Sequence, residues 1–331
     1  MIRRVGIVGA GAWGTALALV ARRAGRDVVI QAYEPEVADA IATRRENPEY
    51  LPGIALDPAI RATRHVADAA AADAVLLAVP AQFLRNVCKR LRPSWKDGTP
   101  AVICAKGIEQ ETLALMSEVV EETLPEARIA VLSGPTFARE VARELPTAVT
   151  LATTDQALGE ALASAIGTPR FRTYLSTDVV GAQLGGAVKN VLAIACGIVI
   201  GRGLGDNARA ALITRGLAEI VRLGHAKGAK PETLMGLSGI GDLALTCHAM
   251  QSRNFSVGVA IGKGERLDDI LKQRKSVAEG VFTASSVVGL ARKVGVEMPI
   301  CTAIDQVLNH FADIDAAITS LLARPFKAET A

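Results

Sequence analysis

A single lysine, Lys189, stands in the middle of the small and apolar run 185-GGAVKNVLAIACG-197. On a helix that starts near Val179, the residues three and four positions away are glycine, leucine and alanine, so the lysine projects from a face of mainly small residues. Desolvation there lowers the pKa of a lysine and lets it exchange a proton near neutral pH. A carbonyl that is reduced by hydride needs such a donor at its oxygen. The alternative is a lysine that extends to the surface or pairs with a core carboxylate, and the residue taken alone favours that alternative.

A carboxylate partner for this lysine is offered by the segment 236-GLSGIGDLALTC-247. The segment places Asp242 in a glycine-flanked turn, at or near a helix start, with Thr246 one helical turn later. The aspartate can hold the ammonium in place, or it can be an ordinary N-cap. Its presence shifts the interpretation of Lys189 toward catalysis.

A phosphate site is indicated by the segment 251-QSRNFS-256. Arg253 and Asn254 lie at another expected helix start, with Ser252 as a candidate capping residue. Arginine combined with the N–H groups of a helix N-terminus binds phosphate. By contrast, His248 has no partners at metal-ligand spacing, so we expect no metal site.

A glycine-rich loop, 9-GAGAWG-14, matches G-x-G-x-x-G directly after the apolar run VGIV and at the start of the helical pattern AWGTALALVARRA. This context is typical of dinucleotide binding. Gly9 permits the tight turn, Gly11 lets the backbone approach a pyrophosphate, and Gly14 lets the helix pack close to the sheet. The helix N-terminus then faces the phosphates. A glycine-rich turn without a ligand is the alternative, which the context disfavours.

The next expected strand ends in 31-QAYEP-35, where Glu34 lies 20 residues beyond Gly14. An acidic side chain at this place accepts hydrogen bonds from the adenosine ribose hydroxyls, whereas a 2′-phosphate prefers an arginine. The segment has no arginine. It therefore favours NAD over NADP, the alternative being that Glu34 is a solvated turn residue.

Two further loops, 105-AKGIE-109 and 133-SGPTFA-138, follow expected strands. Ligands of open α/β sheets bind off the carboxyl ends of the strands, so both loops should open onto the cofactor crevice. Lys106 would meet a phosphate or a polarised oxygen there, and Gly134 and Thr136 would bring backbone and a hydroxyl close to a small ligand. A lone lysine after a strand is more often solvated, so this interpretation of Lys106 depends on its partners.

The hydrophobic pattern predicts the elements that position these residues. Short apolar runs alternate with helical patterns up to about Leu175, which indicates a Rossmann-type, doubly wound parallel sheet with helices on both faces. The runs are Val5–Val8, Val28–Ile30, Ala74–Val79, Ala101–Ala105, Ile129–Ser133, Ala148–Ala152 and Phe171–Leu175. Beyond them the segments are mainly helical. We therefore expect a dinucleotide-binding domain over residues 1–176 and an all-α substrate-binding and catalytic domain over residues 177–331.

Composition limits the class of protein. Half of the 331 residues are apolar, and 37 Lys and Arg against 34 Asp and Glu give a net charge of +3, which argues against a dedicated nucleic-acid binder. Five cysteines without paired spacing fit a reduced, cytoplasmic setting. Residues 179–200 approach transmembrane length, but the polar residues near their centre favour a buried helix, so we expect no membrane insertion.

Together, the motifs GAGAWGTALA, AKGIE, SGPTFA, GAVKNVLAIACGI, AALITRGLAE, GLSGIGDLALTC, SRNF and AEG resemble those of bacterial-type NAD(P)-dependent glycerol-3-phosphate dehydrogenases. The resemblance covers nearly the whole chain in order. It implies an oxidoreductase that interconverts dihydroxyacetone phosphate and sn-glycerol 3-phosphate by hydride transfer with NAD(P)H, and that supplies glycerol phosphate for phospholipid synthesis. A homodimer is compatible with it, although the sequence alone does not fix the oligomeric state.

The same resemblance implies roles for individual residues. The catalytic set would be Lys189 as proton donor and acceptor, with Lys106, Asp242 and Thr246. The substrate-binding set would be Lys106, Gly134, Thr136, Lys189, Asp242, Ser252, Arg253 and Asn254. The cofactor-binding set would be Gly9, Gly11, Ala12, Trp13, Gly14, Tyr33, Glu34, Lys106, Ala138, Arg253, Val277 and Glu279. Tyr33 stands where bacterial members often carry arginine or histidine, which again favours NAD.

Two rival classes share part of this pattern. A 3-hydroxyacid or 6-phosphogluconate-type dehydrogenase has the same architecture, and Arg253 and Asn254 favour a substrate phosphate over a carboxylate. A dinucleotide-sensing protein without chemistry has no need for a desolvated lysine beside a carboxylate.

Overall fold

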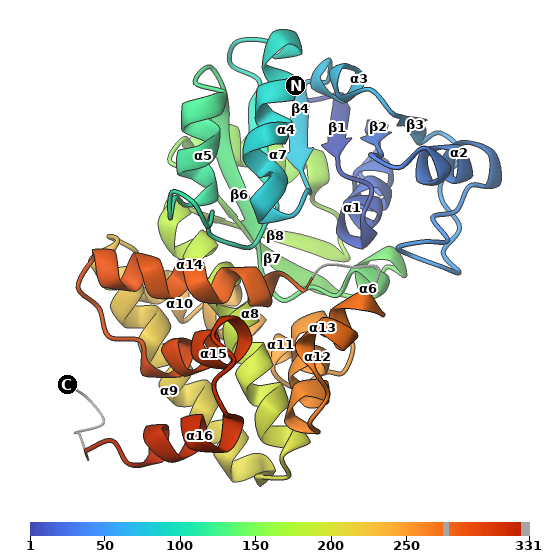
Figure 1. Ribbon diagram of the computed structural model, residues 1–331. Coiled ribbons are helices and arrows are strands. Elements are labelled where there is room, and N and C mark those ends of the chain that lie inside the picture. The colour runs from blue at the N-terminus through green and yellow to red at the C-terminus, as the bar shows by residue number, and fades with distance from the viewer. Residues whose placement is uncertain (274–277, 326–331) are drawn as a thin grey trace.

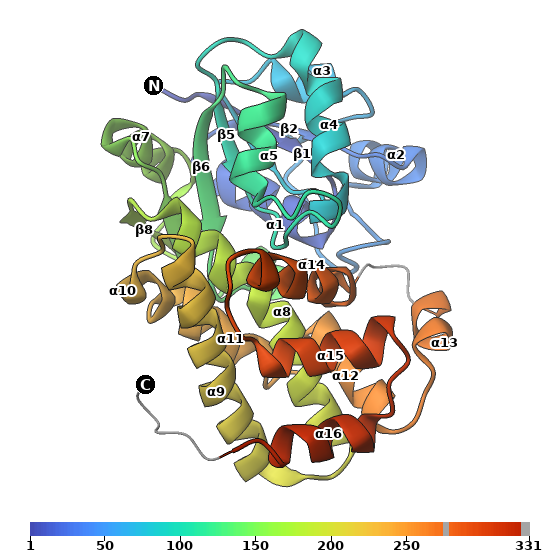
Figure 2. The same cartoon turned by 60° about the vertical axis from the view of Figure 1, so that its left-hand side comes forward.

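The computed structural model describes residues 1–273 and 278–325 (Figure 1). A sheet flanked by helices takes up the first half of the chain, and helices alone form the second half. Figure 2 shows the long helix α8 (Val179–Gly201) below the sheet and among the other helices of the second half. This arrangement confirms the predicted fold class, a Rossmann-type α/β half followed by an all-α half.

Eight strands form one sheet in the order β3-β2-β1-β4-β5-β6-β7-β8. The strands are β1 Arg4–Val8, β2 Asp27–Gln31, β3 Arg61–Thr63, β4 Ala74–Leu77, β5 Pro100–Ile103, β6 Arg128–Ser133, β7 Thr147–Ala152 and β8 Phe171–Ser176. The strands from β3 to β6 run parallel, whereas β7 pairs antiparallel with β6 and parallel with β8. The last two strands thus differ from the predicted direction, because an apolar run indicates burial on both faces and not strand direction. The short strand β3 was not predicted, because its sequence, RAT, is not an apolar run.

Helices pack on both faces of the sheet, and together with the strands they form two separate apolar clusters. Those around the sheet are α1 Ala12–Arg23, α2 Pro35–Arg44, α3 Val66–Ala70, α4 Leu84–Leu91, α5 Met116–Thr123, α6 Ala138–Ala142 and α7 Gln156–Ile166, with the short turns η1 Ala81–Phe83 and η2 Arg92–Ser94. After α8 come α9 Gly205–Ala226, α10 Pro231–Leu234, the π-helical turn η3 Leu237–Gly241, α11 Asp242–Thr246, α12 Arg253–Gly262, α13 Leu267–Lys272, α14 Glu279–Lys293, α15 Pro299–Asn309 and α16 Ile314–Leu322. A third apolar cluster lies among these later helices.

The turn between β1 and α1 shows why glycines stand there. Gly9 has a φ of +102°, in the region that favours glycine. A Cβ at Gly14 would lie 1.9 Å from the Gly9 carbonyl oxygen, so only glycine lets α1 start this close to the strand. A Cβ at Gly11 would meet no heavy atom within 4 Å, and this N-cap residue makes no side-chain cap. The N-terminus of α1 therefore opens at the carboxyl end of β1, as anion binding requires.

Helix α8 is the core helix of the second half. It is long and apolar enough to cross a membrane, with a mean hydropathy of 1.8 over its most apolar window. However, 89% of that window is buried inside the protein. A helix that is apolar all round and covered by other helices is a core element, so its hydropathy is explained by packing.

Helices α8 and α12 pack backbone against backbone through glycines. A Cβ at Gly197 would lie 2.2 Å from the Phe255 carbonyl oxygen, and a Cβ at Gly258 would lie 2.1 Å from the Ile194 carbonyl oxygen. Gly201 repeats the close approach one turn further along α8. This contact sets the position of the α12 N-terminus relative to α8.

The variant Gly197→Ala tests this contact. Although alanine is the better helix former, its methyl group must displace the α12 backbone, and such overpacking typically costs about 1–3 kcal/mol. We expect a lower midpoint of urea unfolding. The matched control is Gly289→Ala on α14, where the methyl would meet only the flexible Leu113 side chain. Equal midpoints for the two variants would contradict the packing argument.

Candidate active site

The ammonium of Lys189 is buried against α11. Lys189 is 6% exposed, and its Nζ donates hydrogen bonds to Asp242 Oδ1 and, at 2.9 Å, to Thr246 Oγ1. Thr246 in turn donates to the backbone carbonyl of Asp242 at 2.6 Å, which fixes both side chains on one face of α11. The carboxylate of Asp242 is fully buried. The structure thus brings the predicted catalytic residues Lys189, Asp242 and Thr246 into direct contact.

Burial lowers the pKa of Lys189 from its ordinary value of 10.5 to about 8. Desolvation of the ammonium is the main cause. The carboxylate of Asp242 opposes this shift by stabilising the charged form, and the positive charge of Lys106 adds to it. A lysine with this pKa can hold and release a proton close to neutral pH, as a general acid and base must.

Lys106 reaches the same carboxylate from the sheet. It follows β5, and its Nζ donates to Asp242 Oδ2 at 2.7 Å and to the Gly134 carbonyl oxygen at 2.9 Å. Gly134 lies directly after β6 with a φ of +149°, and the Thr136 hydroxyl donates to the same carbonyl at 3.3 Å. The carboxyl ends of two neighbouring parallel strands therefore complete the cluster, at the edge of the sheet where ligands bind.

Two glycines, one turn before Lys189 on α8, make room for this convergence. A Cβ at Gly185 would lie 2.3 Å from the Ser238 carbonyl oxygen, so the turn that leads into Asp242 packs directly on the α8 backbone. A Cβ at Gly186 would lie 3.4 Å from Lys106 Cγ. The predicted face of small residues is thus the surface that Lys106 and the turn before Asp242 approach.

Two asparagines connect the lysine cluster with α12. Asn190 Nδ2 donates to the Lys106 carbonyl oxygen at 3.1 Å, and Asn254 Nδ2 donates to Asn190 Oδ1 at 2.9 Å. Asn254 Oδ1 also accepts from the Gly280 N–H at 3.0 Å, so this predicted phosphate ligand uses much of its amide inside the protein. Asn190 is absent from the predicted site residues, although its place beside Lys189 in an apolar run was an available signal.

The N-terminus of α12 carries the other predicted phosphate ligands. Ser252 is its N-cap, with Oγ accepting from the Phe255 N–H at 3.2 Å, and Arg253 is the first helical residue. The next residue, Asn254, joins this helix end to the lysine cluster through Asn190. An arginine at a helix N-terminus thus lies near the two lysines, which is a suitable arrangement for a phosphorylated substrate.

Several of the predicted nucleotide-binding residues follow the carboxyl ends of β1 and β2. Ala12 and Trp13 begin α1 directly after the glycine turn. Beyond β2, Tyr33 is 78% exposed, and Glu34 accepts a hydrogen bond from the Tyr50 hydroxyl at 2.9 Å. Burial and this bond raise the pKa of Tyr50 to about 12. Tyr50 is a second residue that the sequence pattern did not indicate, because it stands in the loop after α2.

Glu279 joins the two halves of the chain. It begins α14, and its carboxylate accepts from the Ala81 N–H at 3.1 Å. Burial raises the pKa of Glu279, and the positive charge of Arg253 opposes that shift. Ala138, another predicted cofactor contact, begins α6. Val277 lies outside the described residues.

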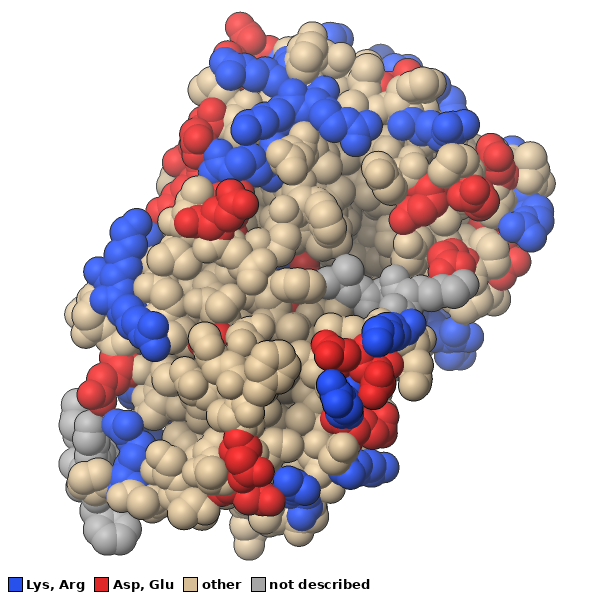
Figure 3. Space-filling model, in the orientation of Figure 1, with Lys and Arg blue, Asp and Glu red and all other residues tan. Residues whose placement is uncertain are grey.

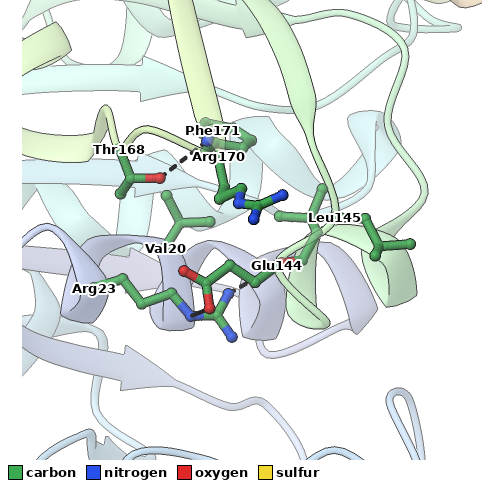
Figure 4. Close-up of a pocket in the computed structure, with 8 residues that line it drawn as sticks. Val20, Arg23, Glu144, Leu145, Thr168, Arg170 and Phe171 are labelled. Atoms are coloured by element: carbon green, nitrogen blue, oxygen red, sulfur yellow. Dashed lines mark hydrogen bonds and ion pairs between the residues drawn. The ribbon is translucent and has the colours of Figure 1, made fainter.

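A hollow of about 480 Å³ among α14, α15 and α16 has none of the predicted site residues in its lining. Figure 3 shows acidic and basic side chains mixed over the surface, which is hollowed between the two halves. Figure 4 shows a separate small hollow between α1, α6 and β8, with a volume of about 10 Å³ and residues such as Arg23 and Glu144 in its lining. Small-molecule sites measure roughly 300–1,000 Å³, so this hollow is too small for a substrate. Within residues 1–273 and 278–325, no group of three or more His, Cys, Asp or Glu could hold a metal ion.

A glycine turn typical of dinucleotide binding, together with a buried lysine–aspartate cluster, indicates a nicotinamide-linked dehydrogenase with a helical second half. Two family models match the chain. Residues 4–159 match the N-terminus of NAD-dependent glycerol-3-phosphate dehydrogenase, and residues 178–319 match its C-terminus. The chain belongs to the NAD-dependent glycerol-3-phosphate dehydrogenase family.

Individual relatives agree over the full length. The glycerol-3-phosphate dehydrogenase (NAD(P)+) of Rhodospirillum rubrum is 62% identical over 330 residues, which cover 99% of this chain and 95% of the relative. The glycerol-3-phosphate dehydrogenase (NAD(P)+) of Caulobacter vibrioides is 57% identical over 326 residues, which cover 98% of this chain and 98% of the relative. The crystal structure of glycerol-3-phosphate dehydrogenase from Coxiella burnetii is 38% identical with a TM-score of 0.94, and it covers 98% of this chain and 99% of its own. The similarity therefore extends well beyond the nucleotide loop.

The variant Asp242→Asn tests the electrostatics of the cluster. Removing one partner of a buried ion pair typically costs about 3–5 kcal/mol, because an uncompensated charge remains. Without the carboxylate the pKa of Lys189 falls further below about 8. Relative to the native protein, the free energy of unfolding of the variant should therefore be reduced most at acidic pH. This difference should shrink as the pH rises to about 8, where native Lys189 also begins to lose its proton.

Urea unfolding of both proteins across this pH range measures the difference. The double variant Asp242→Asn/Lys189→Met is the control, and it should recover part of the stability because the most buried ammonium is gone. An Asp242→Asn protein as stable as the native one in acid would contradict the ion-pair account.

Proposed function

We propose that Lys189 is the proton donor and acceptor of the reaction of this family, the interconversion of dihydroxyacetone phosphate and sn-glycerol 3-phosphate. In reduction the ammonium donates a proton to the substrate oxygen O2, and in oxidation the neutral amine takes that proton back. The observation that carries this proposal is the buried Lys189 amine, anchored by Asp242 and with a pKa of about 8. A bound nicotinamide supplies or takes the hydride at C2, so the residues of the chain need only position the substrate and move the proton.

In this proposal Asp242 positions both lysines and offsets part of their positive charge. One carboxylate faces two ammonium groups, so the cluster is net positive when both lysines are protonated. A positive cluster in a buried site stabilises the negative charge that develops on O2 as the carbonyl is reduced. Thr246 keeps the Lys189 amine in place through its hydroxyl.

The N-terminus of α12 is the proposed phosphate site. Arg253 and the first N–H groups of the helix would bind the substrate phosphate, with Ser252 and Asn254 shaping the helix end. Binding energy at the phosphate, remote from C2, then orients the carbonyl toward Lys189. Gly134 and Thr136 complete the proposed substrate-binding set from the sheet side.

The glycine turn is the proposed site of the cofactor pyrophosphate. The open space at Gly11 and the uncapped start of α1 fit a phosphate group approaching the backbone. Trp13, Ala138 and Glu279 would border the rest of the dinucleotide. The chain would then hold the nicotinamide between the strand ends and α14, where Lys106 and Glu279 lie.

We propose NAD as the preferred of the two cofactors. Glu34, held by the Tyr50 hydroxyl, can accept hydrogen bonds from ribose hydroxyls, whereas it would repel a 2′-phosphate. Tyr33 is exposed beside it and offers no positive charge. A cytoplasmic location, a homodimer and a role in supplying glycerol phosphate for phospholipids are further proposals, which the family resemblance supports.

The variant Lys189→Met tests the catalytic proposal. Methionine keeps the volume and removes the proton donor, and loss of a general acid typically costs about 10²–10⁴-fold in rate. We expect NADH binding to persist while kcat for dihydroxyacetone phosphate falls by this factor. The control is Lys263→Met at the exposed end of α12, which should leave kcat unchanged. Native turnover in a folded Lys189→Met protein would refute the assignment.

The pH dependence follows from the pKa of about 8 for Lys189. Reduction needs the protonated lysine, so kcat/KM for dihydroxyacetone phosphate should fall about tenfold per pH unit above about 8. Oxidation of glycerol 3-phosphate needs the neutral lysine, so its kcat/KM should rise through the same region. Profiles that are flat between about pH 7 and about pH 10 in both directions would exclude Lys189 as the titrating group.

The variant Tyr33→Arg tests the proposed cofactor preference. The native enzyme should use NADH at least as well as NADPH, and an arginine at this position should raise kcat/KM for NADPH by supplying a cation for the 2′-phosphate. Tyr174→Arg, on another tyrosine that is 51% exposed, should change neither cofactor's kcat/KM. A native enzyme that strongly prefers NADPH would contradict the role given to Glu34.

A further inference from the structure

The hydroxyl group of Ser133 lies beside the lysine cluster but differs from the polar groups of that cluster in its hydrogen bonding. Ser133 is the last residue of β6 and is 4% exposed, and its Oγ has no hydrogen-bond partner within residues 1–273 and 278–325. A buried hydroxyl without a partner is unfavourable, and in a site that binds a ligand it is a candidate contact for that ligand. The side chains of Lys106, Lys189, Asp242 and Thr246 nearby all have partners.

Ser133 packs from β6 against α8, one helical turn before the proposed catalytic lysine Lys189. A Cβ at Gly186 would be 2.8 Å from Ser133 Oγ and 3.4 Å from Lys106 Cγ, so the hydroxyl and the Lys106 stem lie side by side over this glycine. Helix side chains lean toward the N-terminus, so Lys189, three residues after Gly186, extends over the same face. The residue after Ser133 is Gly134, whose carbonyl binds Lys106 Nζ. The unpartnered hydroxyl therefore packs on α8 one turn before Lys189, beside the Lys106 stem.

We propose that Ser133 is a specificity-determining residue that hydrogen-bonds with the C1 hydroxyl of dihydroxyacetone phosphate. The inference rests on the proposed function, which places O2 at Lys189 and the phosphate at α12. The C1 hydroxyl is then the remaining polar group of the substrate, and its oxygen is two bonds from C2. It both donates and accepts hydrogen bonds, and a serine hydroxyl can match either role, whereas an ammonium only donates.

This contact would let the site reject a ketone that lacks the C1 hydroxyl. A site built to hydrogen-bond a substrate hydroxyl discriminates strongly against the analogue without it, since the protein group is then left buried and unpaired. A purely structural serine gives a different result. Its replacement would lower stability or affect both substrates equally, because no contact to C1 would be lost.

The test compares dihydroxyacetone phosphate with 2-oxopropyl phosphate, which carries a methyl group in place of the C1 hydroxymethyl. For Ser133→Ala we expect kcat/KM for dihydroxyacetone phosphate, with NADH, to fall by roughly 5- to 100-fold. The value for 2-oxopropyl phosphate should stay within about threefold of native, and the unfolding temperature should not fall, because no hydrogen bond of the free protein is removed. Thr283→Val is the matched control, since Thr283 on α14 is another buried residue whose hydroxyl is unpartnered among the described residues. It should leave the ratio of the two kcat/KM values unchanged.

Two outcomes would overturn the inference. One is an unchanged ratio in Ser133→Ala, with or without a loss of stability. The other is a native enzyme that reduces both substrates with equal kcat/KM, which would leave the role of Lys189 intact. If the native enzyme reduced neither substrate, the proposed function itself would fail.

Discussion

The carboxylate of Asp242, fully buried between two ammonium groups, is the interaction on which the site depends. A buried lysine alone would lose its proton or leave the core, and a buried aspartate alone would be equally unfavourable. With the carboxylate present, ion pairing offsets part of the desolvation at Lys189, and its pKa stays within reach of neutral pH. The same carboxylate holds Lys106, so one residue sets the geometry of both lysines.

This cluster also joins the two halves of the chain. Lys106 comes from the sheet, whereas Lys189 and Asp242 come from the helical half, so the Lys106–Asp242 ion pair forms only when the two halves pack together. The Asn190 bond to the Lys106 backbone and the Glu279 bond to the Ala81 N–H strengthen the same interface. A hydride acceptor and its proton donor must be positioned together, and an interface built from the proposed catalytic residues would provide that positioning.

Local patterns could predict much of this structure, because alternating apolar runs and helical periodicity reflect burial directly. The glycine turn and the small-residue face around Lys189 were visible for the same reason, since each is a local requirement for close approach. The antiparallel direction of β7 was not visible, because an apolar run carries no direction. Nor was the internal hydrogen bonding of Asn254 or the pairing of Glu34 with Tyr50, since these partners meet only through the tertiary fold.

The most direct measurement of the central claim is the titration of Lys189 itself. In enzyme labelled with carbon-13 at the lysine Cε atoms, NMR follows the protonation of each lysine, and the spectrum of the Lys189→Met variant identifies the resonance. The account predicts that Lys189 of the free enzyme titrates near pH 8. A titration at the ordinary lysine value of 10.5 would contradict it, because burial beside Asp242 would then have no effect on the proton that the reaction requires.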